Sequence, residues 1–166
     1  MCLITFHNTP LIADKDIVSY KIVEKIYDIN GDARYITPYQ KIVITPNTKY
    51  SEPELENDFV PELENDFVYN GTEFTGYVSK GFFHSYSSLE ETQFICEHFQ
   101  PINCSATITL KNYVIMKCII PKNTKYYTGI FHGHVWLNNK NLTNYNSVSY
   151  ASKSIKILDE YVPDNN

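Results

Sequence analysis

The sequence predicts an α+β protein, with a mostly antiparallel or mixed β-sheet of about eight short strands and one main helix at 88–99. Its 166 residues are 43% hydrophobic and 20% charged, which is enough apolar material for one core. Short β-branched and aromatic segments recur between turn residues, and a single segment carries the signals of an amphipathic helix. We therefore expect one domain spanning 1–166.

The first strands are predicted from β-branched residues that alternate with polar ones. Segment 16–26 is the longest of these, and its period of two places Ser19, Lys21 and Val23 on one face. Asn30 and Gly31 supply turn chemistry directly after it. Further short strands are expected at 35–37, 41–45, 74–79 and 82–85.

The helix and the later strands follow from local capping and burial signals. Ser87 or Ser88 can cap the helix, acidic residues occupy its first turn, and Pro101 ends it. After it, strands are expected at 106–110, at 113–120 and, as one or two strands, at 147–158. Segments 44–50 and 120–126 both place Asn-Thr-Lys-Tyr after a proline, which indicates a shared turn or a coincidence of composition.

An exact tandem repeat of Pro-Glu-Leu-Glu-Asn-Asp-Phe-Val occupies 53–60 and 61–68. Two copies of eight residues are too few for a solenoid, so we expect a duplicated loop insertion at about 51–68. Seven acids and no bases fall between Glu52 and Asp66, and the remainder of the chain has twelve acids against fourteen bases. The segment is therefore either a solvated insertion or an acidic docking site for a protein partner.

Charge and the N-terminal residues exclude several classes of function. A net charge of −5 argues against nucleic-acid binding, and no apolar run is long enough to span a bilayer. The N-terminus has no signal-peptide pattern, so we expect a cytoplasmic protein, in the host cell if a phage encodes it. The four cysteines then read as free thiols, with Cys2 either a hydrophobic position or an N-terminal nucleophile.

Metal sites are not predicted. His132-Gly133-His134 and the cluster of Cys96, His98 and Cys104 are the nearest approaches to a ligand set, but neither has a recognised zinc spacing. We expect no metal and no cofactor.

The segment 80–88 is the strongest candidate for a binding site. It places His84, Ser85 and Tyr86 at a strand end that leads into a helix N-terminus, where backbone N–H groups and the helix dipole favour an anion. The alternative is that its serines only cap the helix and that His84 is a half-buried strand residue. Fourteen tyrosines against one tryptophan also suit the stacking of a planar ligand, although the composition as a whole is rich in Ile, Lys, Asn and Tyr.

Three blocks carry a resemblance to a known group of proteins. They are Gly81-Phe82-Phe83-His84-Ser85-Tyr86, the segment 114–129 that contains Lys-Cys-Ile-Ile-Pro-Lys-Asn-Thr-Lys-Tyr-Tyr, and Tyr150-Ala151-Ser152-Lys153-Ser154-Ile155-Lys156-Ile157. Together they resemble small proteins of gut bacteria and their phages, over most of the chain outside the acidic repeat. Their order more distantly resembles the ADP-ribosyltransferase fold, with Tyr20-Lys21 at its early motif and 83–86 at its middle motif. The third motif of that fold carries a catalytic glutamate, and Tyr150-Ala151-Ser152-Lys153 has none.

The resemblance implies a pocket that holds a nucleotide without the carboxylate that transfer chemistry needs. We therefore expect a non-catalytic binding protein, phage-encoded, that sequesters a nucleotide or NAD-derived signalling molecule as an anti-defence protein. The alternatives are an atypical ADP-ribosyltransferase-like enzyme and a protein-binding inhibitor that acts through the acidic loop; a homo-oligomer is also open. The expected ligand-binding residues are Tyr20, Lys21, His84, Ser85, Tyr86, Lys122, Lys125 and Tyr126.

Overall fold

A computed structural model describes residues 3–5, 7, 9–38, 41–51, 68–69, 72–73, 76–78, 81–97, 112–131 and 148–163. Most of the acidic repeat, the strand expected at 106–110 and the His132-Gly133-His134 motif lie outside these residues, as do Cys2 and Cys104. Within the described part, no helix has the length and apolarity that crossing a bilayer requires.

The predicted α+β class is wrong, because the described chain is nearly all β. It forms fourteen strands and one helix, α1 (Leu89–Glu97), and its strand pairs are antiparallel. The helix lies inside the predicted range of 88–99, but its nine residues are too few to form a second layer. The expected number of strands was also too low, because several strands have only two to four residues. Such short segments carry too little alternation to be recognised in a sequence.

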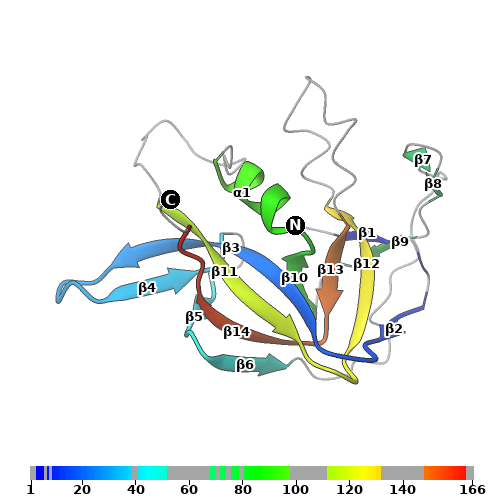
Figure 1. Ribbon diagram of the computed structural model, residues 1–166, viewed down its shortest axis with the longest axis horizontal. Helices are drawn as coiled ribbons and strands as arrows, with labels where there is room; N and C mark the ends of the chain where they lie inside the picture. Colours follow the sequence, from blue (N-terminus) through cyan, green and yellow to red (C-terminus); the bar gives the residue numbers. More distant parts are fainter. Residues whose placement is uncertain are drawn as a thin grey trace.

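Three long strands form the middle of the main sheet: β3 (Ile17–Tyr27), β11 (Tyr113–Ile120) and β14 (Ser154–Glu160) (Figure 1). The other strands on the path through this sheet are β1 (Leu3–Thr5), β6 (Thr48–Ser51), β9 (Gly76–Val78), β10 (Phe83–Tyr86), β12 (Lys125–Phe131) and β13 (Ser149–Ser152). Their order is β6-β14-β11-β3-β10-β13-β12-β1-β9.

Five shorter strands complete the description. Off the path lie β2 (Leu11–Ile12), β4 (Ala33–Ile36) and β5 (Val43–Ile44), and β7 (Val68–Tyr69) pairs with β8 (Thr72–Glu73) in a second sheet. Strands β4 and β5 extend the far end of β3 as an arm, which Figure 1 shows on its left-hand side.

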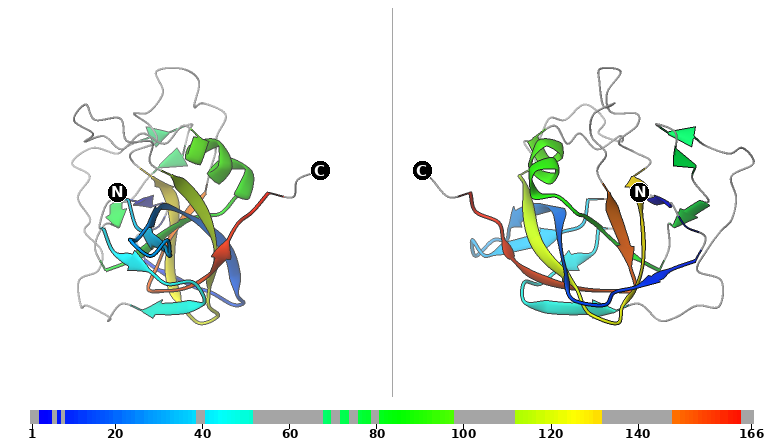
Figure 2. Two further views of the ribbon diagram at one scale, coloured as in Figure 1. Left: turned by 90° about the vertical axis from the view of Figure 1, so that its left-hand side faces the viewer. Right: turned by 45° about the vertical axis from the view of Figure 1, so that its right-hand side comes forward.

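The main sheet closes on itself through one bent strand. Only Lys153 separates β13 from β14, and the circuit β14-β11-β3-β10-β13 is hydrogen-bonded at every step. The curvature in Figure 2 brings β6 toward β10, where the ring centroids of Tyr50 and Phe83 are 6.2 Å apart. The sheet therefore has an inner face, enclosed by this circuit, and an outer face.

Each face buries its own apolar cluster. The inner cluster consists of Val23, Ile44, Met116, Cys118, Ile155 and Ile157. The outer cluster consists of Leu3, Ile22, Val78, Phe82, Tyr86, Tyr127 and Ala151, and Ile95 and Cys96 of α1 pack against it. Because strand residues alternate between faces, the register decides which cluster each residue joins.

Two tight turns confirm the shared turn expected from the echo between 44–50 and 120–126. Asn47 and Asn123 both adopt positive φ, at 58° and 66°, and strands β6 and β12 begin one and two residues later. Asparagine tolerates this left-handed conformation better than other residues with a Cβ atom, which explains why the same residue stands at both turns.

Candidate functional site

The amine of Lys21 is the most unusual group on the inner face. Its Nζ donates a hydrogen bond to the main-chain oxygen of His84 at 2.8 Å. Among the residues that the structure describes, no carboxylate forms an ion pair with it. Protein packed around the amine lowers the pKa of Lys21, although the residue as a whole retains some exposed surface. An ammonium held away from water without a counter-anion is costly, so this position favours either a neutral amine or a bound anion.

Two serine hydroxyls without a hydrogen-bond partner lie on the same face. Ser19 precedes Lys21 by two residues on β3, and Tyr20 pairs with Tyr86, which places Ser85 beside Lys21 on the neighbouring strand. The Oγ atoms of Ser19 and Ser85 are both buried and unpartnered. Each such hydroxyl costs roughly 1–3 kcal/mol, so their presence together indicates a site that another molecule completes.

A buried thiol borders the two serines and the lysine. Cys118 is the cross-strand partner of Ser19, and burial raises the pKa of its thiol to about 12, with the charge of Lys21 acting in the opposite direction. The thiol is therefore neutral and contributes no negative charge. Lys21, Ser19, Ser85 and Cys118 are called the inner polar cluster below.

A pair of tyrosines lies in the next rows of the same face. Ser85 pairs with Tyr150, which in turn pairs with Thr128 on β12, so all three side chains point to one side of the sheet. The rings of Tyr150 and Tyr126 pack edge to face, with centroids 5.9 Å apart and planes at 75°. Both tyrosines are partly exposed, and burial raises the pKa of Tyr150. The inner polar cluster thus adjoins an aromatic pair that solvent reaches.

The sheet divides the residues that the sequence grouped as one site. Lys21, Ser85 and Tyr126 face inward, whereas Tyr20, His84 and Tyr86 face outward. The imidazole Nε2 of His84 lies 3.1 Å from the main-chain oxygen of Val78, and burial lowers the pKa of His84 to about 3. A neutral imidazole on the outer face cannot neutralise a phosphate held on the inner face.

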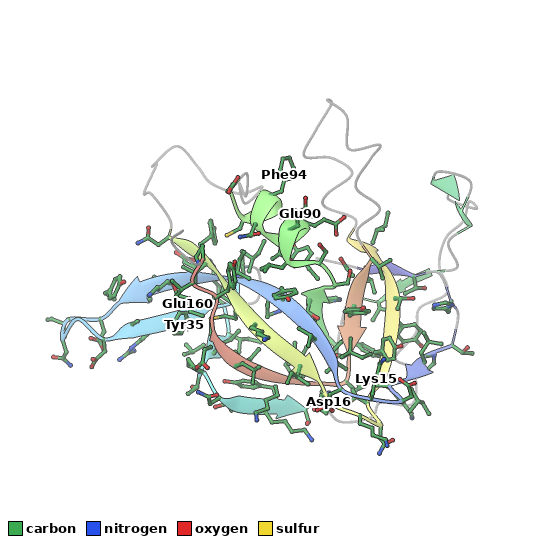
Figure 3. The ribbon with its side chains drawn as sticks, in the orientation of Figure 1. Lys15, Asp16, Tyr35, Glu90, Phe94 and Glu160 are labelled. Carbon is green, nitrogen blue, oxygen red and sulfur yellow. The ribbon has the colours of Figure 1, made fainter. Side chains whose placement is uncertain are left out.

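The two remaining lysines of the predicted site lie at the end of the sheet. Lys122 is exposed in the turn between β11 and β12, and its N–H donates to the carboxylate of Asp16 at 2.8 Å. Asp16 is labelled in Figure 3 at the lower end of β3, five residues and about 16 Å along the strand from Lys21. Lys125 pairs with Ile12 of β2 and, by alternation from Tyr126, faces outward. Neither lysine is brought to the inner polar cluster.

The serines at the start of the helix act as a cap. Ser88 Oγ accepts a hydrogen bond from the N–H of Glu91 at 3.3 Å, as the capping interpretation predicts. This contact accounts for Ser88 without a ligand. Within the described residues, no group of three or more His, Cys, Asp or Glu side chains is placed to hold a metal ion.

Sequence reasoning missed a second cluster, where the arm leaves the sheet. Glu160 Oε2 accepts hydrogen bonds from Lys25 Nζ at 2.7 Å and from the hydroxyl of Tyr35 at 2.9 Å, and Figure 3 shows Tyr35 and Glu160 side by side. The hydrogen bond to Glu160 raises the pKa of Lys25. Alternation along β3 could place Lys25 on the face of Lys21, but nothing in the sequence pairs it with Glu160, since the register between β11 and β14 shifts before Glu160.

No family model, curated protein or solved structure matches this chain. The resemblances described from the sequence therefore remain predictions, and the function has to be argued from the residues.

Proposed function

We propose that this chain is a non-catalytic binding protein that holds a small phosphorylated, nucleotide-like ligand on the inner face of its sheet. One observation carries the proposal: the amine of Lys21 has no counter-anion among the described residues and lies beside two buried, unpartnered serine hydroxyls. An anionic group with several acceptor oxygens supplies what all three groups lack.

The electrostatics of the cluster support phosphate as that group. Phosphate oxygens can accept from Lys21 Nζ and from the hydroxyls of Ser85 and Ser19, none of which carries negative charge. Burial lowers the pKa of Lys21 in the ligand-free protein, and an adjacent anion raises it again. Binding is therefore coupled to uptake of a proton by the amine at any pH above its ligand-free pKa.

The neighbouring tyrosines support a planar group on the same ligand. Tyr150 is adjacent to Ser85 in the register and is partly exposed, together with Tyr126. A base or nicotinamide ring can stack on such a pair while its phosphate lies on Lys21. The role that follows for a small protein with such a site is sequestration of a nucleotide or NAD-derived signalling molecule, as the resemblance to phage proteins implies.

The test is calorimetry with inorganic phosphate, AMP, ADP and NAD on the purified chain. We expect binding of at least one nucleotide, with Lys21→Met reducing affinity by at least about tenfold, since a buried charge-assisted hydrogen bond contributes roughly 1.5–3 kcal/mol. Lys122→Met is the matched control, because Lys122 is exposed and remote from the cluster, and it should bind as the wild type does. Absence of binding by the folded wild-type protein, or equal losses in both variants, would contradict the proposal.

A further inference from the structure

We propose that Lys21 is also a reactive amine that condenses with a small aldehyde to form an imine on the inner face of the sheet. The proposal goes beyond phosphate binding, because it depends only on the amine and its surroundings. It assigns to this position a covalent modification by a carbonyl compound.

The geometry separates Lys21 from other described lysines. Lys25 is held as a cation by Glu160 at 2.7 Å, and Lys41 lies 3.2 Å from the carboxylate of Glu24. Lys21 has no such carboxylate, and its one hydrogen bond goes to a neutral carbonyl oxygen. A lysine is nucleophilic only in its neutral form, which apolar surroundings favour and a carboxylate opposes.

The titratable groups around Lys21 agree with this assignment. Cys118 on β11 has a raised thiol pKa and His84 on β10 a lowered imidazole pKa, so both are neutral near pH 7. The only charged pair further along the same face of β3 is Lys25 with Glu160, whose charges compensate each other. Desolvation therefore dominates and lowers the pKa of Lys21, which increases its neutral fraction at a given pH.

The reaction balances without an oxidant or reductant. The lone pair of Nζ forms a bond to the carbonyl carbon, and the carbonyl oxygen takes up a proton as the nitrogen loses one, giving a carbinolamine. Loss of the hydroxyl group with the second nitrogen proton then releases water and leaves the C=N bond. The hydroxyls of Ser85 and Ser19, which have no other partner, can donate to the departing oxygen.

Reductive trapping tests the inference. The wild-type chain is treated at about pH 8 with limiting propionaldehyde and cyanoborohydride, and the alkylation of each lysine is followed by peptide mass spectrometry. At this pH ordinary lysines are almost wholly protonated, so we expect Lys21 to be labelled at least about tenfold faster than exposed Lys122. A rate for Lys21 equal to or below that of Lys122 would overturn the inference.

Two further arms separate this inference from the proposed function. In Lys21→Arg, labelling at position 21 should vanish while Lys122 reacts at its wild-type rate; a changed rate at Lys122 would show that the preference is a property of the whole protein and would also overturn the inference. Propionaldehyde carries no phosphate, so fast labelling of Lys21 in a chain that binds no nucleotide would refute the proposed function and leave this inference standing. Nucleotide binding with slow labelling would do the reverse.

Discussion

Lys21 and His84 are joined by a hydrogen bond although their side chains serve opposite faces of the sheet. The amine of Lys21 donates to the main-chain oxygen of His84 at 2.8 Å, while the His84 imidazole lies 3.1 Å from the main-chain oxygen of Val78 on the outer face. Strand β10 is thus a partition, with Ser85 directed to the inner polar cluster and Tyr86 to the outer core. The ligand-binding role falls to the inward residues.

Replacement of Lys21 by methionine should change how stability depends on pH. The folded-state pKa of Lys21 is lowered, so between that pKa and about 10.4 the unfolded chain binds more protons than the folded chain. The free energy of unfolding of the wild type should therefore rise with pH across this window relative to that of Lys21→Met. Urea denaturation of both proteins at about pH 6 and pH 9 measures this difference.

The same comparison gives the expected sign at low pH. Below its folded-state pKa the wild type bears the full cost of a desolvated ammonium, so Lys21→Met should be at least as stable as the wild type. A variant that is less stable than the wild type at every pH would show that Lys21 has a counter-charge, contrary to this account.

Ser85→Ala should leave the ligand-free protein as stable as the wild type, or raise its free energy of unfolding by up to about 1 kcal/mol. The Oγ of Ser85 has no partner, so its removal relieves a desolvated hydroxyl and breaks no hydrogen bond. The control is Ser154→Ala, because Ser154 Oγ donates to the Tyr50 carbonyl at 3.0 Å and lies 2.9 Å from Ser51 Oγ. That variant should lose about 1 kcal/mol, and equal effects at the two positions would contradict the assignment of Ser85.

Glu160→Gln should lower the free energy of unfolding by about 1 kcal/mol, since it removes an ion pair with Lys25 and weakens the hydrogen bond from Tyr35. The two charged side chains are 20% and 22% exposed, so solvent screens the pair only in part. Lys41→Met provides the comparison, because Lys41 is 55% exposed in its pair with Glu24 and should lose less than about 0.5 kcal/mol. Thermal denaturation of the three proteins measures the order, and a larger loss in Lys41→Met would refute it.

Asn123→Ala should destabilise the protein by about 1 kcal/mol, whereas Asn123→Gly should be neutral within a few tenths. The φ of Asn123 is 66°, which glycine adopts at no steric cost and alanine does not. The same pair of substitutions at Asn47, with a φ of 58°, should give the same order of melting temperatures. Equal melting temperatures for the alanine and glycine variants would show that neither turn depends on the left-handed conformation.

Much of the strand structure could be predicted where a strand is long and its pattern is unbroken. The predicted segment 113–120 coincides with β11, and 16–26 lies one residue from β3, because both are rich in apolar and β-branched residues. The fold class was nevertheless wrong. Pairs such as β4 with β5 depend on backbone partners distant in sequence, and two or four residues carry no periodicity from which to infer them.

The candidate site was predicted in part. The sequence could identify Lys21 and Ser85, and alternation along β3 already placed Ser19 and Lys21 on one face. It could not show that His84 and Tyr86 lie on the other side of the sheet, because that depends on the pairing of Tyr86 with Tyr20. The lysines at 122 and 125 were grouped with the site by resemblance alone, and the sheet keeps them at its far end.

Nuclear magnetic resonance of the chain with ¹⁵N-labelled lysine tests the central claim most directly, by following the titration of the Lys21 amine with and without a nucleotide. We expect Lys21 to titrate below the exposed lysines, which do so near 10.4, and its pKa to rise when the nucleotide is added. Titration of Lys21 together with the exposed lysines, unchanged by saturating nucleotide, would contradict the account.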